Sequence, residues 1–270
     1  MLLGLTYQFD YLNREGEDEG AGHGGMSHEM EAEALRGQVH TGTFNASLGV
    51  SSWFTVGLLF PFTYKSQDVP VGMGETARTT GGIGDPLLLL KFTLWGHEAV
   101  APGALRLGLI GGIKLPVGRS RARDDLGRLP QGFQVSSGAL DLLAGVNGSW
   151  GPAAKTQLLA SVTYRHSFKD EDEYAFGEGV TATADVQIAH LYPLAITGGL
   201  RLAANGSDSE RGEEVPASSA LLLSAHLGLT YFITPSLFVN LDALTPMYWK
   251  LEGAFLTNRF TGVLGVTVIL

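Results

Sequence analysis

The sequence contains no cysteine, and this removes several kinds of chemistry at once. Without thiols the chain has no disulfide framework, no thiolate metal site and no cysteine nucleophile. Basic residues are also scarce, because 18 Lys and Arg stand against 27 Asp and Glu and give a net charge of -9. A protein that binds nucleic acid needs a basic surface, so we expect no nucleic-acid partner.

An apolar membrane helix is missing as well, although one segment has the length for it. Residues 215–241 contain no Asp, Glu, Lys or Arg and are long enough to cross a bilayer. However, Pro235 interrupts the segment, and small or polar residues fill alternate positions from Ser224 to Thr230. A period of two residues predicts a strand rather than a helix.

The start of the chain shows no secretory leader. It alternates from its first residues, without a basic segment or a cleavage site. We expect an exported protein whose signal peptide has been removed.

The same alternation recurs along the whole chain. At the N-terminus, Leu3, Leu5 and Tyr7 share one face of a strand, and Thr6 and Gln8 share the other. Twelve segments behave in this way: 2–12, 37–50, 53–65, 82–95, 104–117, 133–149, 153–168, 177–191, 194–204, 218–233, 237–249 and 257–270.

Two architectures bury one face of each strand: a soluble sandwich and a membrane barrel. The segments are roughly 10 to 15 residues long, whereas strands of soluble proteins usually have about 5 to 6. A strand that crosses a membrane needs about 9 to 11 residues with a continuous apolar side. The pattern favours the barrel.

Connection lengths complete this prediction. Short turns near 51–53, 150–152, 191–194 and 234–236 alternate with longer charged connections near 13–36, 66–81, 118–132, 169–176, 205–217 and 250–256. Outer-membrane barrels have an even number of antiparallel strands, short periplasmic turns and long outer loops. We therefore predict an all-β protein: a single domain, residues 1–270, forming a transmembrane antiparallel up-and-down barrel of about 12 strands. It would lie in the lipid of a Gram-negative-type outer membrane, with both termini periplasmic.

Three passages resemble an outer-membrane transporter family associated with the meta-pathway of phenol degradation. They are "TGGIGDPLLLLKFTLW" (80–95), "GIKLPVGRSRARDDLGRLPQGFQVSSGALDLLAGVNGSWG" (112–151) and "LLASVTYRHSF" (158–168). The shared features are a Gly-Gly-x-Gly-Asp strand opening, a Leu-Pro-x-Gly strand end and a glycine-rich return to the wall. They cover about the middle third of the chain. The resemblance implies a barrel and the passage of small organic molecules, and it assigns no binding residue.

If the apolar faces meet lipid, the opposite faces line the interior. Charges of both signs lie there, and in a barrel of this size we expect a narrow, hydrated lumen. The predicted lumen-lining residues are Asp10, Lys91, Arg106, Lys114, Asp141, Arg165, Asp185, Arg201, His226, Asp242 and Arg259. These charges favour a passive channel with little preference for ion sign, unless they only pair with one another and close the barrel.

One predicted loop carries a further pattern. Residues 22–33 contain His23, Met26, His28 and Met30. Imidazole and thioether ligands suit copper, especially Cu(I), although these residues also fit a solvated glycine-rich loop. Copper at this loop is the one cofactor that the sequence suggests.

The sequence gives little sign of an enzyme. Ser224 and His226 share a strand face, but the chain has many serines, and an inward Ser and His more often line a lumen. No nucleotide or zinc motif is present. We predict a passive channel for small, apolar or aromatic solutes. The alternative is a non-conducting barrel that serves as scaffold or binding partner of an envelope complex, with a metal-binding outer loop.

Overall fold

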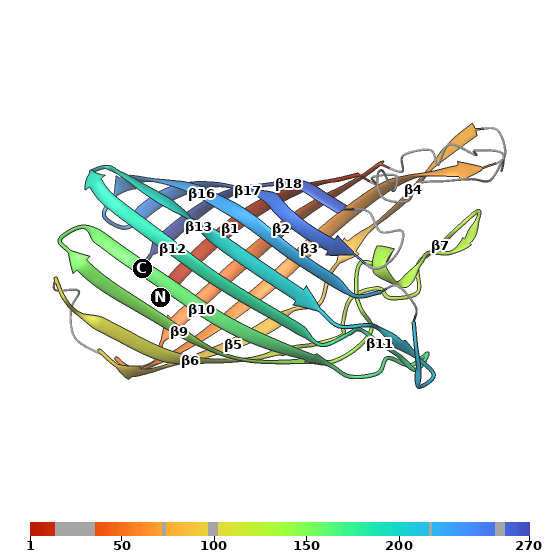
Figure 1. The fold of residues 1–270 in the computed structure, drawn as a ribbon, viewed down its shortest axis with the longest axis horizontal. Coiled ribbons are helices and arrows are strands. Elements are labelled where there is room, and N and C mark those ends of the chain that lie inside the picture. Colours follow the sequence, from red (N-terminus) through yellow and green to blue (C-terminus); the bar gives the residue numbers. More distant parts are fainter. Residues whose placement is uncertain (14–35, 72–73, 97–101, 216–217, 252–256) are drawn as a thin grey trace, which may run out of the picture.

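The computed structural model describes residues 1–13, 36–71, 74–96, 102–215, 218–251 and 257–270. They form a closed antiparallel barrel (Figure 1). The main sheet has thirteen strands, of which β4 and β5 succeed each other along β3, so the wall has twelve positions. The predicted fold class and strand number are confirmed.

The wall follows chain order. Its strands are β1 (Leu2–Asn13), β2 (Arg36–Gly49), β3 (Phe54–Val71), β4 (Gly74–Ile83), β5 (Leu87–Trp95), β6 (Leu105–Lys114), β9 (Asp141–Ala153), β10 (Thr156–Ser167), β12 (Gly179–Leu191), β13 (Leu194–Asn205), β16 (Ala220–Thr234), β17 (Leu237–Leu251) and β18 (Thr257–Ile269). The connections hold β7 (Arg123–Asp124), β8 (Gly127–Arg128), the 3-10 turn η1 (Gln131–Phe133), β11 (Tyr174–Ala175), β14 (Ser209–Glu210) and β15 (Glu213–Glu214).

The first and last strands close the barrel. They pair from Leu2 with Ile269 to Asn13 with Thr257. Closure leaves no open sheet edge in hydrocarbon, where unpaired backbone groups are costly. Both termini lie at the end that carries the short turns (Figure 1). The membrane side that this end faces stays a prediction.

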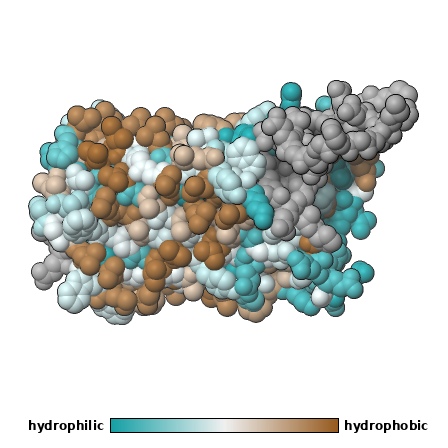
Figure 2. Space-filling model, in the orientation of Figure 1, coloured by the Kyte–Doolittle hydropathy of each residue, from teal (hydrophilic) through white to brown (hydrophobic). Residues whose placement is uncertain are grey.

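The apolar faces of the strands point outward. Leu5, Leu227 and Leu241 are each more than half exposed. Of the five buried apolar residues in the described part of the chain, four lie in the connection between β6 and β9: Ala122, Leu129, Phe133 and Ala139. A sandwich would bury its strand faces in a core, so this structure excludes the soluble alternative. Exposed apolar side chains on the outside of a closed barrel suit contact with lipid, and Figure 2 shows them on one face of the wall.

Two predicted strands differ from the structure. Segment 82–95 breaks at Gly84-Asp85-Pro86, and β3 and β4 continue as a hairpin through most of 66–81, which we predicted to be a loop. Segment 133–149 pairs only from Asp141 onward. Gln134 and Ser136 are instead buried, with hydrogen bonds to the connection itself and to Asp85.

No helix among the described residues is both long and apolar enough to cross a membrane.

Candidate functional site

Residues 115–140 connect β6 to β9, and we call them the mouth loop. They occupy the end of the barrel opposite the termini (Figure 1). β6 ends at Lys114 and β9 begins at Asp141, so the mouth loop leaves the wall and returns to it at one pair of facing residues. The mouth loop is held on two sides, first by the strands that precede it and then by the connection that follows β10.

Asp85 anchors the first side. It lies in the break between β4 and β5, and its side chain is only 6% exposed. Its carboxylate accepts four hydrogen bonds: from Gly118 N (3.1 Å), Ser136 Oγ (2.5 Å), Ser137 N (3.0 Å) and Ser137 Oγ (3.2 Å). These bonds join both ends of the mouth loop to one carboxylate. Hydrogen bonds to an ionised group are the strong ones, so Asp85 is a principal tether.

Two cations on the same side add to this tether. On β3, Lys65 Nζ donates to the carbonyl oxygens of Gly132 (3.1 Å) and Gln134 (2.7 Å). On β4, Arg78 forms a bidentate pair with Asp124 at 2.7 and 2.8 Å. Hydrogen bonding from Arg78 lowers the pKa of the Asp124 carboxyl below its ordinary value.

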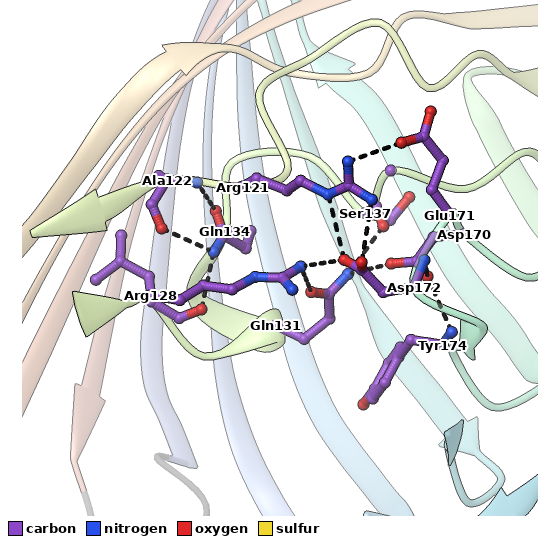
Figure 3. Close-up of polar contacts among 12 residues, drawn as sticks. Arg121, Ala122, Arg128, Gln131, Gln134, Ser137, Asp170, Glu171, Asp172 and Tyr174 are labelled. Atoms are coloured by element: carbon purple, nitrogen blue, oxygen red, sulfur yellow. Dashed lines mark hydrogen bonds and ion pairs between the residues drawn. The ribbon is translucent and has the colours of Figure 1, made fainter. Parts of the chain in front are cut away.

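The second side is held by the connection between β10 and β12 (Figure 3). Arg121 and Arg128 both donate to Asp172, at 3.0 and 2.6 Å. Gln131 Nε2 donates to Asp170 Oδ2 at 3.0 Å. Hydrogen bonds from the two arginines lower the pKa of Asp172. Ion pairs thus join the basic part of the mouth loop to the connection that follows β10.

Inside the mouth loop, a small core fixes its shape. Phe133 packs in one buried cluster with Ala122 and Leu129. Gln134 is 2% exposed, and its side chain bonds the backbone of Ala122 and Leu129. A loop with its own core and satisfied polar groups has one defined conformation. Its contacts run to β3, β4, β6 and the connection after β10.

The opposite half of the wall holds two cavities. One, of about 270 Å³, we call the Asp10 cavity. Its lining comes from β1, β13, β16, β17 and β18, and β18 contributes Asn258, Thr261 and Val263. The other, of about 320 Å³, we call the His226 cavity; it also reaches β12. Arg201, Leu244 and Val263 line both cavities, so the two adjoin.

Three predicted residues meet in the His226 cavity. Nδ1 of His226 lies 2.9 Å from Asp185 Oδ1, and its Nε2 lies 3.2 Å from Asp242 Oδ1. Each ring nitrogen therefore has a carboxylate within hydrogen-bond distance. No ring nitrogen remains for Ser224, which argues against the Ser-His pair considered from the sequence.

Glycines give this cluster its room. A Cβ on Gly199 would contact Asp185, and one on Gly228 would contact Asp242. The side chains therefore lie flat along the wall instead of projecting across the lumen. The many glycines on the inward faces are explained here by close approach of neighbouring side chains.

Asp10 is almost fully covered by protein donors. It is 8% exposed, and its oxygens accept from Thr261 (2.5 Å), Asn258 (3.1 Å) and Gln8 (2.8 Å). Arg201 differs: it is exposed, and its side chain makes no hydrogen bond or ion pair with any residue that the structure describes.

The remaining predicted lumen residues lie elsewhere. Lys114 pairs with Asp141 at 2.5 Å beneath the mouth loop. Arg165 donates to the carbonyl of Gly177 at 3.0 Å. The Arg259 guanidinium lies 4.8 Å from the Trp249 ring centre.

Two predicted cations lie near the end with the short turns. Lys91 is paired in register with Thr55, and Arg106 with Ser149.

Apolar side chains form a second group on the inner wall. The inward positions of β5, β6, β9 and β10 include Leu87, Leu89, Ile110, Leu143 and Leu159. A Cβ on inward-facing Gly112 would meet Leu89 and Leu143, which places these two side chains together. Leu87 and Leu89 were visible in the sequence as apolar residues on an otherwise polar face.

Sequence reasoning missed most of the mouth-loop tethers, among them Ser136, Ser137 and Asp172. Their only signal was Gly84-Asp85-Pro86, where a proline stops a strand beside an acid. The predicted copper ligands, His23, Met26, His28 and Met30, lie outside the described residues. Within the described part, no group of three or more His, Cys, Asp or Glu residues is placed to hold a metal ion.

Comparisons with known proteins bear on the fold. An outer membrane channel from Pseudomonas putida F1 matches with a TM-score of 0.73 at 13% sequence identity, covering 100% of this chain and 95% of that one. The translocator domain of autotransporter NalP from Neisseria meningitidis gives 0.51 at 10%, covering 100% and 88%. The NanC porin gives 0.50 at 10%, covering 97% and 100%.

Sequence comparisons add no family. No protein-family model matches the chain, and no curated protein matches it. The resemblance to the phenol-pathway transporters therefore stays a prediction. Channels, porins and a translocator domain share the fold, so the fold alone does not choose a cargo.

Proposed function

We propose that this protein is a passive channel of a Gram-negative-type outer membrane, and that it admits small solutes, apolar and aromatic ones included. The observation that carries the proposal is the division of the barrel interior. The mouth loop is tethered to β3 and to the connection after β10, with a cavity of about 310 Å³ between it and the wall, while the wall from β12 round to β1 carries two adjoining cavities free of that loop. Solutes would pass along that second wall, with outer-membrane lipid around the barrel.

The inner wall supports both parts of this cargo description. Polar groups on β12 to β1 keep a path hydrated, and Leu87, Leu89 and Leu143 give the facing strands an apolar lining. Binding sites for small organic molecules are mostly apolar with a few placed polar groups. Such a lining suits small solutes that bind weakly to an apolar surface from water.

A matched pair of substitutions tests the path. Ala203 lines the Asp10 cavity, and its neighbour Leu202 faces outward, 39% exposed. In planar bilayers we expect a single-channel step from the wild type, a clearly smaller step from Ala203→Trp, and an unchanged step from Leu202→Trp. Liposome swelling with small aromatic alcohols should follow the same order. Equal steps from both variants would place the path elsewhere, and a folded barrel that never conducts would end the proposal.

A second candidate function rests on the mouth loop itself. Its tethers on two sides would also suit a barrel that never opens and acts as scaffold or binding partner of an envelope complex. A folded, silent barrel in the same bilayer recording would favour this candidate. The suggestion that the 22–33 loop binds copper belongs with it, since a metal-binding outer loop needs no pore.

A further inference from the structure

The Asp10 and His226 cavities contain one cation that the protein leaves unmatched. Arg201 lies on β13 at the junction of both cavities. Its guanidinium makes neither a hydrogen bond nor an ion pair with the described residues. Arg78, Arg121 and Arg128, by contrast, each hold a carboxylate. A guanidinium has five donors in a planar fork, which matches the two oxygens of a carboxylate.

The acids of the same two cavities are already engaged. All of the hydrogen bonds to Asp10 come from Gln8, Asn258 and Thr261. Asp185 and Asp242 share the ring of His226. These three carboxylates therefore have their own partners, and Arg201 stays available to a solute.

Apolar side chains adjoin Arg201 in the Asp10 cavity. Leu222, Leu244 and Val263 line it, with Ala203 and Pro246. Ser224, which is paired in register with Arg201, adds a hydroxyl. A guanidinium beside apolar side chains fits a molecule that carries an anionic group on an apolar body.

We propose that Arg201 binds the carboxylate of small organic acids whose apolar body rests on Leu222, Leu244 and Val263. The inference rests on the proposed channel function and narrows it, since it names a solute class. Arg201 is then a specificity residue of the path: it retains aromatic or short aliphatic acids over neutral molecules of equal size.

Equilibrium binding to the full-length, detergent-solubilised barrel tests this without needing conduction. The probes are benzoate and benzyl alcohol, which differ mainly in charge. We expect the wild type to bind benzoate more tightly than benzyl alcohol. Arg201→Gln should weaken benzoate binding about tenfold or more, because charge-assisted hydrogen bonds are lost. Benzyl alcohol binding should not change, and Arg201→Lys should recover part of the benzoate affinity.

Lys169→Gln is the charge-matched control, since Lys169 lies in the connection after β10, outside both cavities. It should bind benzoate as the wild type does. Equal benzoate affinity in wild type and Arg201→Gln would overturn the assignment, as would a wild type that binds no benzoate. If the channel conducts but benzoate does not bind, only this inference fails. If benzoate binds at Arg201 but no bilayer current appears, only the channel function fails.

Discussion

Asp85 gives the sharpest test of the mouth loop. In Asp85→Asn the side chain keeps one oxygen that can accept hydrogen bonds. Its NH2 group replaces the second oxygen and faces two donors, which it cannot accept from. Two of the four hydrogen bonds are lost, at about 1.5 kcal/mol each for bonds to an ionised group, or about 3 kcal/mol in the free energy of docking the loop. That free energy changes the ratio of docked to undocked loop by about a hundredfold.

The assay is single-channel recording. If the mouth loop covers half of the barrel opening, its release should produce more frequent or larger openings in Asp85→Asn than in the wild type. Asp68→Asn removes the same charge from β3 above the wall, where Asp68 has no described partner, and it should behave as the wild type. A folded Asp85→Asn barrel with wild-type openings would refute the claim that this carboxylate holds the loop in place.

Three further predictions concern the wall, the mouth loop and the 22–33 loop. Gly199→Ala should lower the free energy of unfolding in urea by about 1 to 3 kcal/mol, because its Cβ would overlap Asp185 and the backbone of Ala184. Gly198→Ala, where a Cβ has nothing within 4 Å, should leave that free energy unchanged, and equal losses in both variants would contradict the steric argument. Asp172 has a folded pKa below its ordinary 3.8, so its contribution to loop docking is present above that value and is lost as the pH falls through the lower folded pKa; openings should be unchanged between pH 7 and 5 and increase once the pH falls below 3.8, and a flat record would exclude this clamp. Full-length protein should bind copper more weakly after His23→Ala and His28→Ala together; equal weak binding before and after would remove the metal site.

The interior shows where sequence reasoning succeeded and where it failed. Strand periodicity placed Asp185, His226 and Asp242 on inward faces, because a period of two assigns each residue to a side without knowledge of the partner strand. It did not bring them together, because β12 meets β16 only across β13, and the register of these pairings decides which inward residues become neighbours. Whether a given inward charge is paired, as Lys114 is, or unmatched, as Arg201 is, depends on that register too.

The amino-acid order by itself determined the barrel: long alternating segments with an apolar side, short and long connections in turn, and a last strand fit to meet the first. These are local properties, because each strand needs its own apolar side toward the lipid, whatever its neighbours are. Only the tertiary structure decided what fills the barrel. The mouth loop has the sequence of a polar connection and part of a strand, yet it is bound to Asp85, which lies 33 to 52 residues before its contacts. Contacts between distant segments depend on where closure places them, and no local pattern encodes that position.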